Sequence, residues 1–319
     1  MNVYLTFDIE IWCPGWKNLD RDFPNSYPRY LYGRSKHGDY GLPKTLEILD
    51  KHKLHGVFFV EPLFAARFGL EYLSAIVDMI KSAGQEIQLH LHPEWTDEIT
   101  PPPLPNITRK RPLLSQYSLD EQTHLIGFAL DLLKQAGVEQ VTAFRAGTFS
   151  ANIDTFAAVK NNNILIDSSF NMEMDVSGPD LRKEQSFFTP FEREGVRCYP
   201  MSVFTDGTGH HRHAQLGACS FLEMKQALAS AFDLGWSDFV ILSHNFEMLR
   251  VGGNEPDQIV VKRFENLCDF LSANAERYHV TGWDNPSHSV TPELPSDLPK
   301  TSLISTLVRY GEQAIRRVI

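Results

Sequence analysis

Four apolar segments of this chain each end in ionisable side chains, and this feature restricts its fold more than any other. The segments are VYLTFDIE, QEIQLHLH, VTAFRAG and FVILSH, and they carry Asp8, Glu10, His90, His92, Arg145 and His244. Burial disfavours an unpartnered charge, so this placement on four successive strands is hard to explain by packing. In barrels of parallel strands the carboxyl ends open into one mouth, where chemistry takes place. Carboxylates, imidazoles and a guanidinium gathered there indicate metal-assisted hydrolysis.

Predicted strands and helices alternate along the chain. Strands are predicted at residues 3–8, 56–60, 86–92, 141–144, 164–166, 196–199, 239–242 and 278–281, and helices at 42–52, 70–82, 118–137, 152–161, 220–234 and 256–275. This pattern makes about seven or eight β/α units, as expected for a parallel barrel. An open doubly wound sheet is the alternative, although no predicted strand is followed by its usual glycine-rich nucleotide loop.

The composition is that of an ordinary globular protein, with 42% hydrophobic and 22% charged residues in a chain of 319. The formal net charge of −10 repels phosphate backbones, so no nucleic acid partner is expected. The four cysteines form no CxxC pair and are predicted to be free thiols, with two long-range disulfides as the alternative. The segment MNVYLTFDIE lacks the regions of a signal peptide, and we expect a cytoplasmic protein.

The composition changes near the C-terminus. A barrel domain over residues 1–283 is predicted to be followed by a Pro- and Ser-rich linker over 284–299 and an amphipathic helix over 300–319. In that helix leucines and isoleucines alternate with arginines. Such a helix packs on its own domain, on a partner or on an anionic membrane surface, and the first is the simplest expectation.

Two pairs of ligand-type side chains are spaced two residues apart. On a strand this spacing puts Asp8 and Glu10 on one face, and likewise His90 and His92. Two neighbouring carboxylates need a cation or an arginine between them. A His-x-His strand presents two nitrogens to Zn²⁺ or a similar metal, and Glu94 is an alternative ligand to His92. The sequence therefore predicts a metal site at these strand ends.

Arg145 and Asp167 end the next two predicted strands. A guanidinium beside apolar residues is best explained by a carboxylate partner, and Asp8 is the candidate. Asp167 adds a third acid to the site. Ser168 follows it, and its hydroxyl is either a hydrogen-bond donor to a substrate or the start of a turn.

His244 ends a late predicted strand, far along the chain from the other histidines. A separate imidazole opposite a carboxylate is suited to general acid–base catalysis, and Asp167 or Asp175 is a candidate to orient it. The HHRH run at residues 210–213 lies in a glycine-flanked segment. We expect a solvated loop there, with a second metal site or a loop that closes over substrate as the alternatives.

Together these segments resemble the polysaccharide deacetylase family, also called the NodB-homology family or carbohydrate esterase family 4. TFDIE resembles the family's first motif, usually TFDD, and GQEIQLHLHPE resembles the second, usually G-H-E-I-G-N-H-T-x-x-H. FRAGTFS, IDSSF and ILSH are similar to the third, fourth and fifth motifs. The five motifs follow the family's order from residue 3 to about residue 283.

The resemblance implies an α/β fold, a distorted (β/α)7 barrel of parallel strands. It also implies a divalent metal held by one carboxylate and two histidines, and hydrolysis of an acetyl group on a sugar. By position, Asp8 is the implied general base, Arg145 its orienting partner and His244 the general acid.

Three departures from the family pattern matter. Ile9 stands where the first motif has its second aspartate, so Glu10 must supply the metal carboxylate. The last histidine of the second motif falls on Glu94, which leaves His92 or Glu94 as the third ligand beside His90. The Pro-Tyr that follows the arginine of the third motif is absent, which indicates an altered substrate wall.

The predicted reaction is removal of an N- or O-acetyl group from a sugar, as in surface-glycan biosynthesis, with Zn²⁺ as the expected cofactor. Candidates to stack on sugar rings, with ordinary packing in their loops as the alternative, are the aromatic residues Trp12, Trp16, Tyr27, Tyr30, Tyr32 and Trp95. Two alternatives remain open. One is hydrolysis of another amide, such as a cyclic ureide, and the other is a non-catalytic glycan-binding barrel, against which the retention of Asp8 and His244 argues.

Overall fold

The protein divides into two compact units. The computed structural model describes residues 1–105, 107, 109–174, 188–253, 255–283 and 297–318. Unit 1 comprises Met1–Gly56, Ser202–Thr281 and Pro295–Ile319, and unit 2 comprises Val57–Met201 and Gly282–Leu294. The expected division into a barrel over 1–283, a linker and a C-terminal helix stays a prediction, and residues 284–296 of that linker lie outside the described residues.

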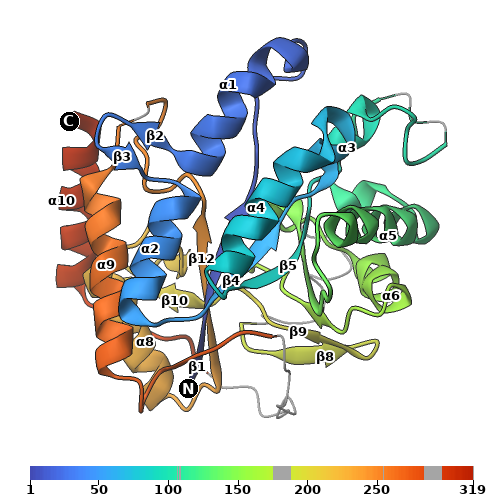
Figure 1. Cartoon of the computed structure of the whole chain (residues 1–319). Helices are drawn as coiled ribbons and strands as arrows, with labels where there is room; N and C mark the ends of the chain where they lie inside the picture. The colour runs from blue at the N-terminus through green and yellow to red at the C-terminus, as the bar shows by residue number, and fades with distance from the viewer. Residues whose placement is uncertain (106, 108, 175–187, 254, 284–296, 319) are drawn as a thin grey trace. The chain divides into compact units, whose positions relative to one another are not determined.

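Unit 1 has parallel strands with helices beside them (Figure 1). Its elements are β1 (Asn2–Ile9), α1 (Leu19–Tyr32), β2 (Arg34–Ser35), β3 (Gly38–Asp39), α2 (Leu42–His52), β10 (Val203–Thr205), β11 (His211–His213), α8 (Phe221–Asp233), β12 (Asp238–His244), α9 (Gln258–Ala273), β13 (His279–Val280) and α10 (Leu303–Val318). β1 pairs in parallel with β12 and with β13. The β1–β12 register sets Asp8 directly opposite His244, so the two carboxyl ends present their ionisable residues side by side.

Unit 2 has the same βα character. Its elements are β4 (Gly56–Val60), α3 (Leu63–Phe68), α4 (Leu70–Ser82), β5 (Glu86–Leu91), η1 (Pro93–Glu98), η2 (Leu114–Gln116), α5 (Leu119–Gln135), β6 (Ala143–Ala146), η3 (Gly147–Phe149), α6 (Ile153–Asn161), β7 (Ile166–Asp167), β8 (Phe191–Arg193) and β9 (Val196–Cys198). The order β4-β5-β6-β7-β9 is parallel throughout, and β8 pairs antiparallel with β9. His90 on β5 lies opposite Arg145 on β6.

The apolar patterns and capping boxes of the sequence form the helices and strands that they predicted. Leu42, Leu46 and Leu49 are buried on one face of α2. All five residues of β4 are buried, because a parallel strand is covered on both faces. The two predicted capping boxes, 118–121 and 220–223, begin α5 and α8 with both reciprocal hydrogen bonds formed.

Helix α1 was not predicted, because Pro24 and Pro28 lie inside it. An apolar face repeated every four residues outweighs this cost, and its members are all buried: Leu19, Phe23, Tyr27 and Leu31. The HHRH segment also differs from expectation, because residues 211–213 form strand β11 against β10 and not a loop. Among the described residues, no metal-like group of three His, Cys, Asp or Glu side chains includes these histidines.

The four cysteines are free thiols, as predicted. Across the described residues, every helix is too short or too polar to cross a bilayer.

Helix α10 packs on its own unit, as expected, but it does so through charged side chains. The buried guanidinium of Arg309 donates from Nε to Glu223 Oε1 at 2.9 Å and from Nη2 to Asp206 Oδ2 at 2.8 Å. The second oxygen of Glu223 accepts from the Ser220 backbone at the start of α8. Both carboxylates are buried, so the arginine supplies the charge that each needs.

We expect Arg309→Ala to lower the free energy of unfolding by about 3 to 5 kcal/mol, because it leaves two buried carboxylates uncompensated. Urea denaturation followed by circular dichroism measures the change. Arg317→Ala is the matched control: Arg317 is exposed on the same helix, and its loss should cost less than about 0.5 kcal/mol. Equal losses in the two variants would contradict this account.

Candidate active site

Three predicted site residues meet at the carboxyl ends of β1 and β12 in unit 1. Ligand-type atoms of Asp8, Glu10 and His244 all lie within 4.8 Å of one another. Both carboxylates are buried, and His244 is half-buried. The parallel register causes this meeting, since it holds Asp8 opposite His244 at the ends of two adjacent strands.

Asn245 fixes this strand end, and the sequence analysis did not single it out. Its backbone N–H donates to Asp8 O at 3.2 Å, and its side-chain Oδ1 accepts from Glu10 N at 3.2 Å. Its Nδ2 donates to the carbonyl oxygens of Glu10 at 3.1 Å and Tyr30 at 2.7 Å. One buried amide therefore ties the end of β1 to β12 and to α1. In the sequence, its position directly after the LSH motif could have indicated a role at the site.

His244 is held by Glu247, which was also missed. Nδ1 of His244 lies 2.9 Å from Glu247 Oε1. The same carboxylate accepts hydrogen bonds from Gln215 Nε2, Gly217 N and the hydroxyl of Ser243. Four hydrogen bonds thus converge on this one carboxylate. The Nδ1–H of His244 thus points at Glu247, and Nε2 is the nitrogen left for chemistry.

The pKa of His244 is raised to about 9. Burial by itself lowers the pKa of the imidazole, but the hydrogen bond to Glu247 and the charges of Glu10, Glu247 and Asp8 outweigh that effect. The ring is therefore protonated near neutral pH. A protonated ring is a good proton donor, which suits His244 to general acid catalysis.

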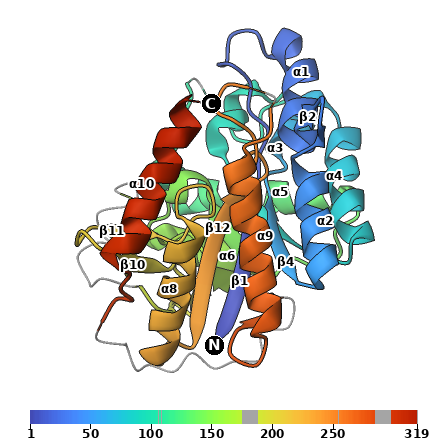
Figure 2. The same cartoon turned by 90° about the vertical axis from the view of Figure 1, so that its left-hand side faces the viewer.

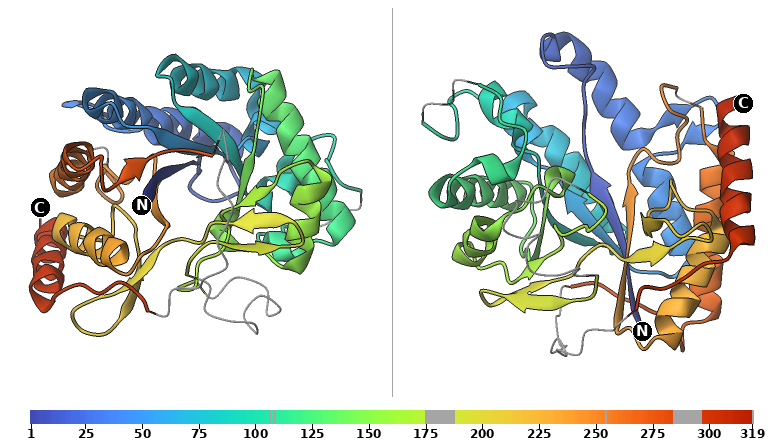
Figure 3. Two further views of the ribbon diagram at one scale, coloured as in Figure 1. Left: turned by 90° about the horizontal axis from the view of Figure 1, so that it is seen from below. Right: turned by 180° about the vertical axis from the view of Figure 1, so that it is seen from behind.

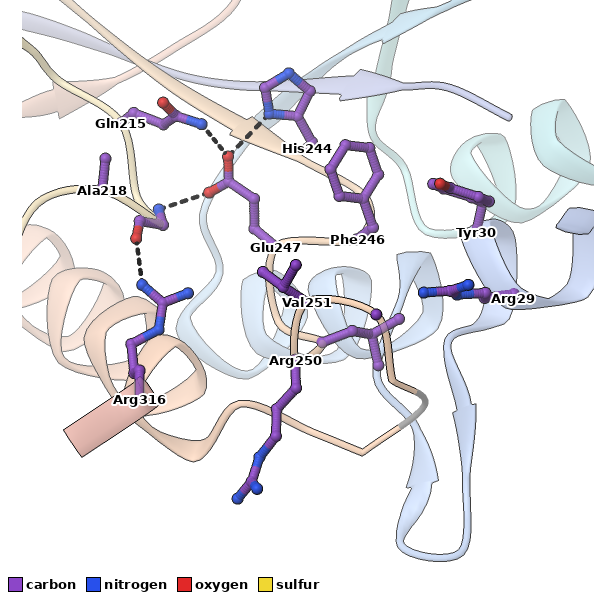
Figure 4. Close-up of a pocket in the computed structure, with 13 residues that line it drawn as sticks. Arg29, Tyr30, Gln215, Ala218, His244, Phe246, Glu247, Arg250, Val251 and Arg316 are labelled. Carbon is purple, nitrogen blue, oxygen red and sulfur yellow. Dashed lines mark hydrogen bonds and ion pairs between the residues drawn. The ribbon is translucent and has the colours of Figure 1, made fainter. Parts of the chain in front are cut away.

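A cavity of about 440 Å³ in unit 1 adjoins this histidine. His244, Glu247, Phe246, Tyr30, Arg29 and Arg250 are among its lining residues (Figure 4). The ring of His244 stacks on Phe246 at 5.2 Å, and Tyr30 meets Phe246 edge-on at 5.4 Å. The cavity therefore has aromatic walls beside His244, an arrangement that suits a sugar ring.

Two aromatic residues expected to contact substrate have other partners. Trp12 in unit 1 donates from Nε1 to Glu10 Oε2 at 2.6 Å and lies edge-on to Trp16. Trp95 in unit 2 is buried and lies edge-on to Phe68. Trp12 thus orients the Glu10 carboxylate directly.

In unit 2, His90 and His92 lie with ring centroids 4.7 Å apart. Nδ1 of His90 is 2.8 Å from the carbonyl oxygen of Arg145, and Nδ1 of His92 is 3.2 Å from Glu94 Oε2. Carbonyl and carboxylate oxygens only accept hydrogen bonds, so in each neutral ring Nδ1 carries the proton and Nε2 carries the lone pair. This second contact is the one that orients metal-binding histidines.

The ring of His92 leaves no space for a side chain at Gly147, in the FRAG segment. A Cβ placed on Gly147 would lie 2.5 Å from Nδ1 of His92, a distance at which one of the two must move. The imidazole therefore rests directly on the backbone that follows β6.

Arg145, Asp167 and Ser168 lie together in the core of unit 2. The fully buried Arg145 donates from Nη2 to Ser168 Oγ at 3.1 Å and from Nε to its carbonyl oxygen at 3.3 Å, and it lies 4.1 Å from the ring of Phe59. Asp167 accepts from both the backbone and hydroxyl of Ser169. Burial raises the pKa of Asp167 to about 6, although Ser169 and Arg145 oppose the rise. The expected pairing of Arg145 with Asp8 stays a prediction.

The predicted site residues thus fall into one group in each unit. Unit 1 brings together Asp8, Glu10, Trp12 and His244, and unit 2 brings together His90, His92, Glu94, Arg145, Asp167 and Ser168. Asp175, the other acid considered for orienting His244, lies outside the described residues.

The fold of the chain matches solved structures closely enough to be assigned. The sequence matches no family model, and comparison with curated proteins finds no relative. A crystal structure of a candidate polysaccharide deacetylase from Mycobacterium smegmatis aligns with a TM-score of 0.54 at 19% identity, over 92% of this chain and 94% of that one. The chain has the polysaccharide deacetylase fold. This confirms the expected NodB-like α/β class.

Other solved structures also align with the chain. A family 4 carbohydrate esterase from Streptomyces lividans aligns at 13% identity over 88% of this chain and 92% of its own, with a TM-score of 0.41. A 4-α-glucanotransferase from Thermococcus litoralis aligns at 10% identity with a TM-score of 0.57, over 96% of this chain and 42% of its own length. In the polysaccharide deacetylase fold of the present chain, the deacetylase-like motifs lie where strands end.

Glu61 is a buried acid near the His92–Glu94 pair that the sequence analysis missed. It follows β4, and its carboxylate accepts from Leu63 N at 2.8 Å. Burial raises its pKa to about 8, which the charge of His92 opposes and that of Glu94 reinforces. Its ionised form is thus unfavourable in the folded chain without a nearby cation.

Glu61→Gln should stabilise the metal-free protein at high pH. The folded pKa of about 8 exceeds the ordinary 4.5, so the stabilisation from protonated Glu61 is complete below pH 4.5 and lost as the pH rises through 8. Relative to Glu61→Gln, the wild type should lose roughly 4 kcal/mol between pH 4.5 and 9. Urea unfolding with a chelator present, at both pH values, measures it. A difference independent of pH would rule this out.

Proposed function

We propose that this chain is a metal-dependent deacetylase that hydrolyses the amide or ester bond of an acetylated sugar. The observation that carries the proposal is the pairing, in unit 1, of a protonated His244 with the carboxylate of Asp8. Hydrolysis of an amide needs an acid and a base whose pKa values are held apart. The polysaccharide deacetylase fold supports the choice of an acetylated carbohydrate as substrate.

Glu10, His90 and His92 are the proposed ligands of a divalent metal, with Zn²⁺ as the expected ion. The donors fit such an ion: each histidine of unit 2 keeps the Nε2 lone pair because its Nδ1 is engaged, and Glu10 is a buried carboxylate. Glu94 then orients His92 and is not itself a ligand. When bound, the metal supplies a Lewis acid for the acetyl carbonyl and lowers the pKa of the attacking water.

The proton transfers are assigned to residues of the chain itself. Asp8 accepts the proton of the attacking water, and Arg145 is its proposed orienting partner. His244 then protonates the leaving nitrogen or oxygen from Nε2, while Glu247 keeps the imidazole in place through Nδ1. Asp167 and Ser168 support Arg145 from within unit 2.

The substrate is proposed to be an N- or O-acetylated sugar of a surface glycan, processed in the cytoplasm. The aromatic walls of the cavity, Tyr30 and Phe246, support a sugar ring beside His244. Trp12, Trp95 and Ser168 remain proposed contacts. The test is acetate release from a panel of N- and O-acetylated sugars by the zinc-loaded chain. Binding to such sugars with no acetate released by wild-type protein would favour a glycan-binding barrel instead.

We expect His244→Gln to lower kcat by about a hundredfold or more, since the leaving group then lacks its proton donor. Glu247→Gln should keep measurable activity but lower the pKa of His244, because it removes the charge that holds the proton. The alkaline limb of the rate profile, expected near pH 9, should then move to lower pH. A profile of kcat against pH measures both, and an unmoved limb would exclude His244 as the acid.

Gly147→Ala should weaken zinc binding by about tenfold or more, because the added methyl group displaces the ring of His92. Isothermal titration with Zn²⁺ measures the affinity. Gly311→Ala is the control, since its Cβ would meet no neighbouring atom. Equal affinities in the two variants would show that His92 is not a ligand.

A further inference from the structure

Helix α10 faces unit 1 with its polar side. Its inward side chains are buried or half-buried, and they are Ser305, Thr306, Arg309, Glu312, Gln313 and Arg316. Besides the Arg309 pairs, Arg263 of α9 donates to Glu312 Oε2 at 2.6 Å. Arg316 donates to Asp257 Oδ2 at 2.5 Å and to Gly217 O at 2.9 Å. Ion pairs therefore hold α10 against α8 and α9, and Figures 2 and 3 show it at the outside of these helices.

The outward side of α10 is almost entirely apolar. Ile304 is 69% exposed, Leu307 56% and Ile315 51%. Over residues 303–317 of the helix, the exposed residues are Leu303, Ile304, Leu307, Val308, Tyr310, Gly311, Ala314, Ile315 and Arg317. At 100° per residue these positions span one continuous half of the helix. This is the reverse of a surface helix in a globular protein, which buries its apolar stripe and exposes its polar one.

The ion pairs prevent the helix from turning its apolar side inward. Rotation about the helix axis would separate Arg309 from two buried carboxylates and Glu312 from Arg263. Breaking a buried pair leaves uncompensated charges, which is strongly destabilising, and the rotation would break several such contacts at once. The apolar half of α10 is thus held outward by unit 1 itself.

Exposed cations lie at both ends of this apolar half. Lys300 is exposed just before the helix, and Arg317 is exposed at its end. Arg250, Arg316 and Arg317 line a hollow beside the last turn, where Asp257 pairs with Arg316. The acidic residue of α10 is Glu312, and it forms an ion pair with Arg263. Cations at both ends of an apolar stripe complement a surface that is apolar inside and anionic outside.

We propose that the outward half of α10 docks the protein on an anionic lipid bilayer, with the helix lying in the plane of the headgroups. Leucine, isoleucine and valine side chains would enter the acyl boundary, and Lys300 and Arg317 would meet lipid phosphates. The formal net charge of −10 does not prevent this, because salt screens charges beyond about 8 Å and the exposed charges at the two ends of the stripe, Lys300 and Arg317, are positive. The inference is independent of the proposed deacetylase activity.

A second copy of the chain fits this face less well. Pairing α10 with its copy in either direction sets the cationic ends against cations, which costs affinity. The exposed stripe is only one helix wide, whereas stable interfaces bury roughly 800 Å² per partner.

Co-sedimentation of the full chain with vesicles tests the proposal. We compare phosphatidylcholine vesicles with and without phosphatidylglycerol, and expect binding that depends on phosphatidylglycerol. The double variant Ile304→Glu with Leu307→Glu should lower the lipid-bound fraction about tenfold or more. Leu165→Glu is the control, because it adds a glutamate at another half-exposed leucine, 49% exposed, outside α10. Lys300→Gln with Arg317→Gln should remove most of the preference for phosphatidylglycerol.

Thermal melts of each variant confirm that the fold is kept, and Ile304→Ala with Leu307→Ala replaces the glutamate pair if it fails to fold. Wild-type protein that stays in the supernatant at every lipid concentration overturns the proposal. So does a dimer in sedimentation velocity that the glutamate pair dissociates, with no vesicle binding, since the occupant is then a second copy. Equal loss of binding in Leu165→Glu also overturns it, because α10 is then not the contact.

Discussion

The Nδ1 hydrogen bonds of three histidines are the constraint on which the candidate site depends. His90 donates to the Arg145 carbonyl, His92 to Glu94 and His244 to Glu247. Each bond fixes a ring and leaves Nε2 as the working nitrogen. In the proposed mechanism the partners separate the roles: a carbonyl or a lone carboxylate suits a ligand, whereas Glu247, helped by Asp8 and Glu10, holds a proton on His244.

These imidazoles are held in place because the backbone beneath them is rigid. The parallel register sets Asp8 beside His244 and His90 beside Arg145. Ionisable side chains of neighbouring strands therefore lie next to one another at the strand ends. Two further residues position the site locally. Asn245 forms hydrogen bonds to the end of β1, and Gly147 leaves space for the ring of His92. Rigid elements are what catalytic geometry requires.

Much of this arrangement was predictable from the sequence, because strand ends and capping boxes are local signals. The βα alternation gave the fold class, and Asp8, Glu10 and His244 were chosen as ionisable residues that end apolar strands. Glu247 was not predictable in the same way: it follows the strand in a loop, and only the turn back toward β12 brings it to His244. The prolines of α1 concealed a helix that its buried face stabilises. For α10, the sequence showed two faces but not that charged partners at residues 206, 223 and 263 would select the polar one.

A crystal structure of the zinc-soaked chain, with the ion located by anomalous diffraction, tests the central claim most directly. The account predicts one ion bound by Nε2 of His90, Nε2 of His92 and a carboxylate oxygen of Glu10, with Nδ1 of His92 still bonded to Glu94. An ion held by Glu94 in place of His92, by His244, or by groups away from these strand ends would contradict it.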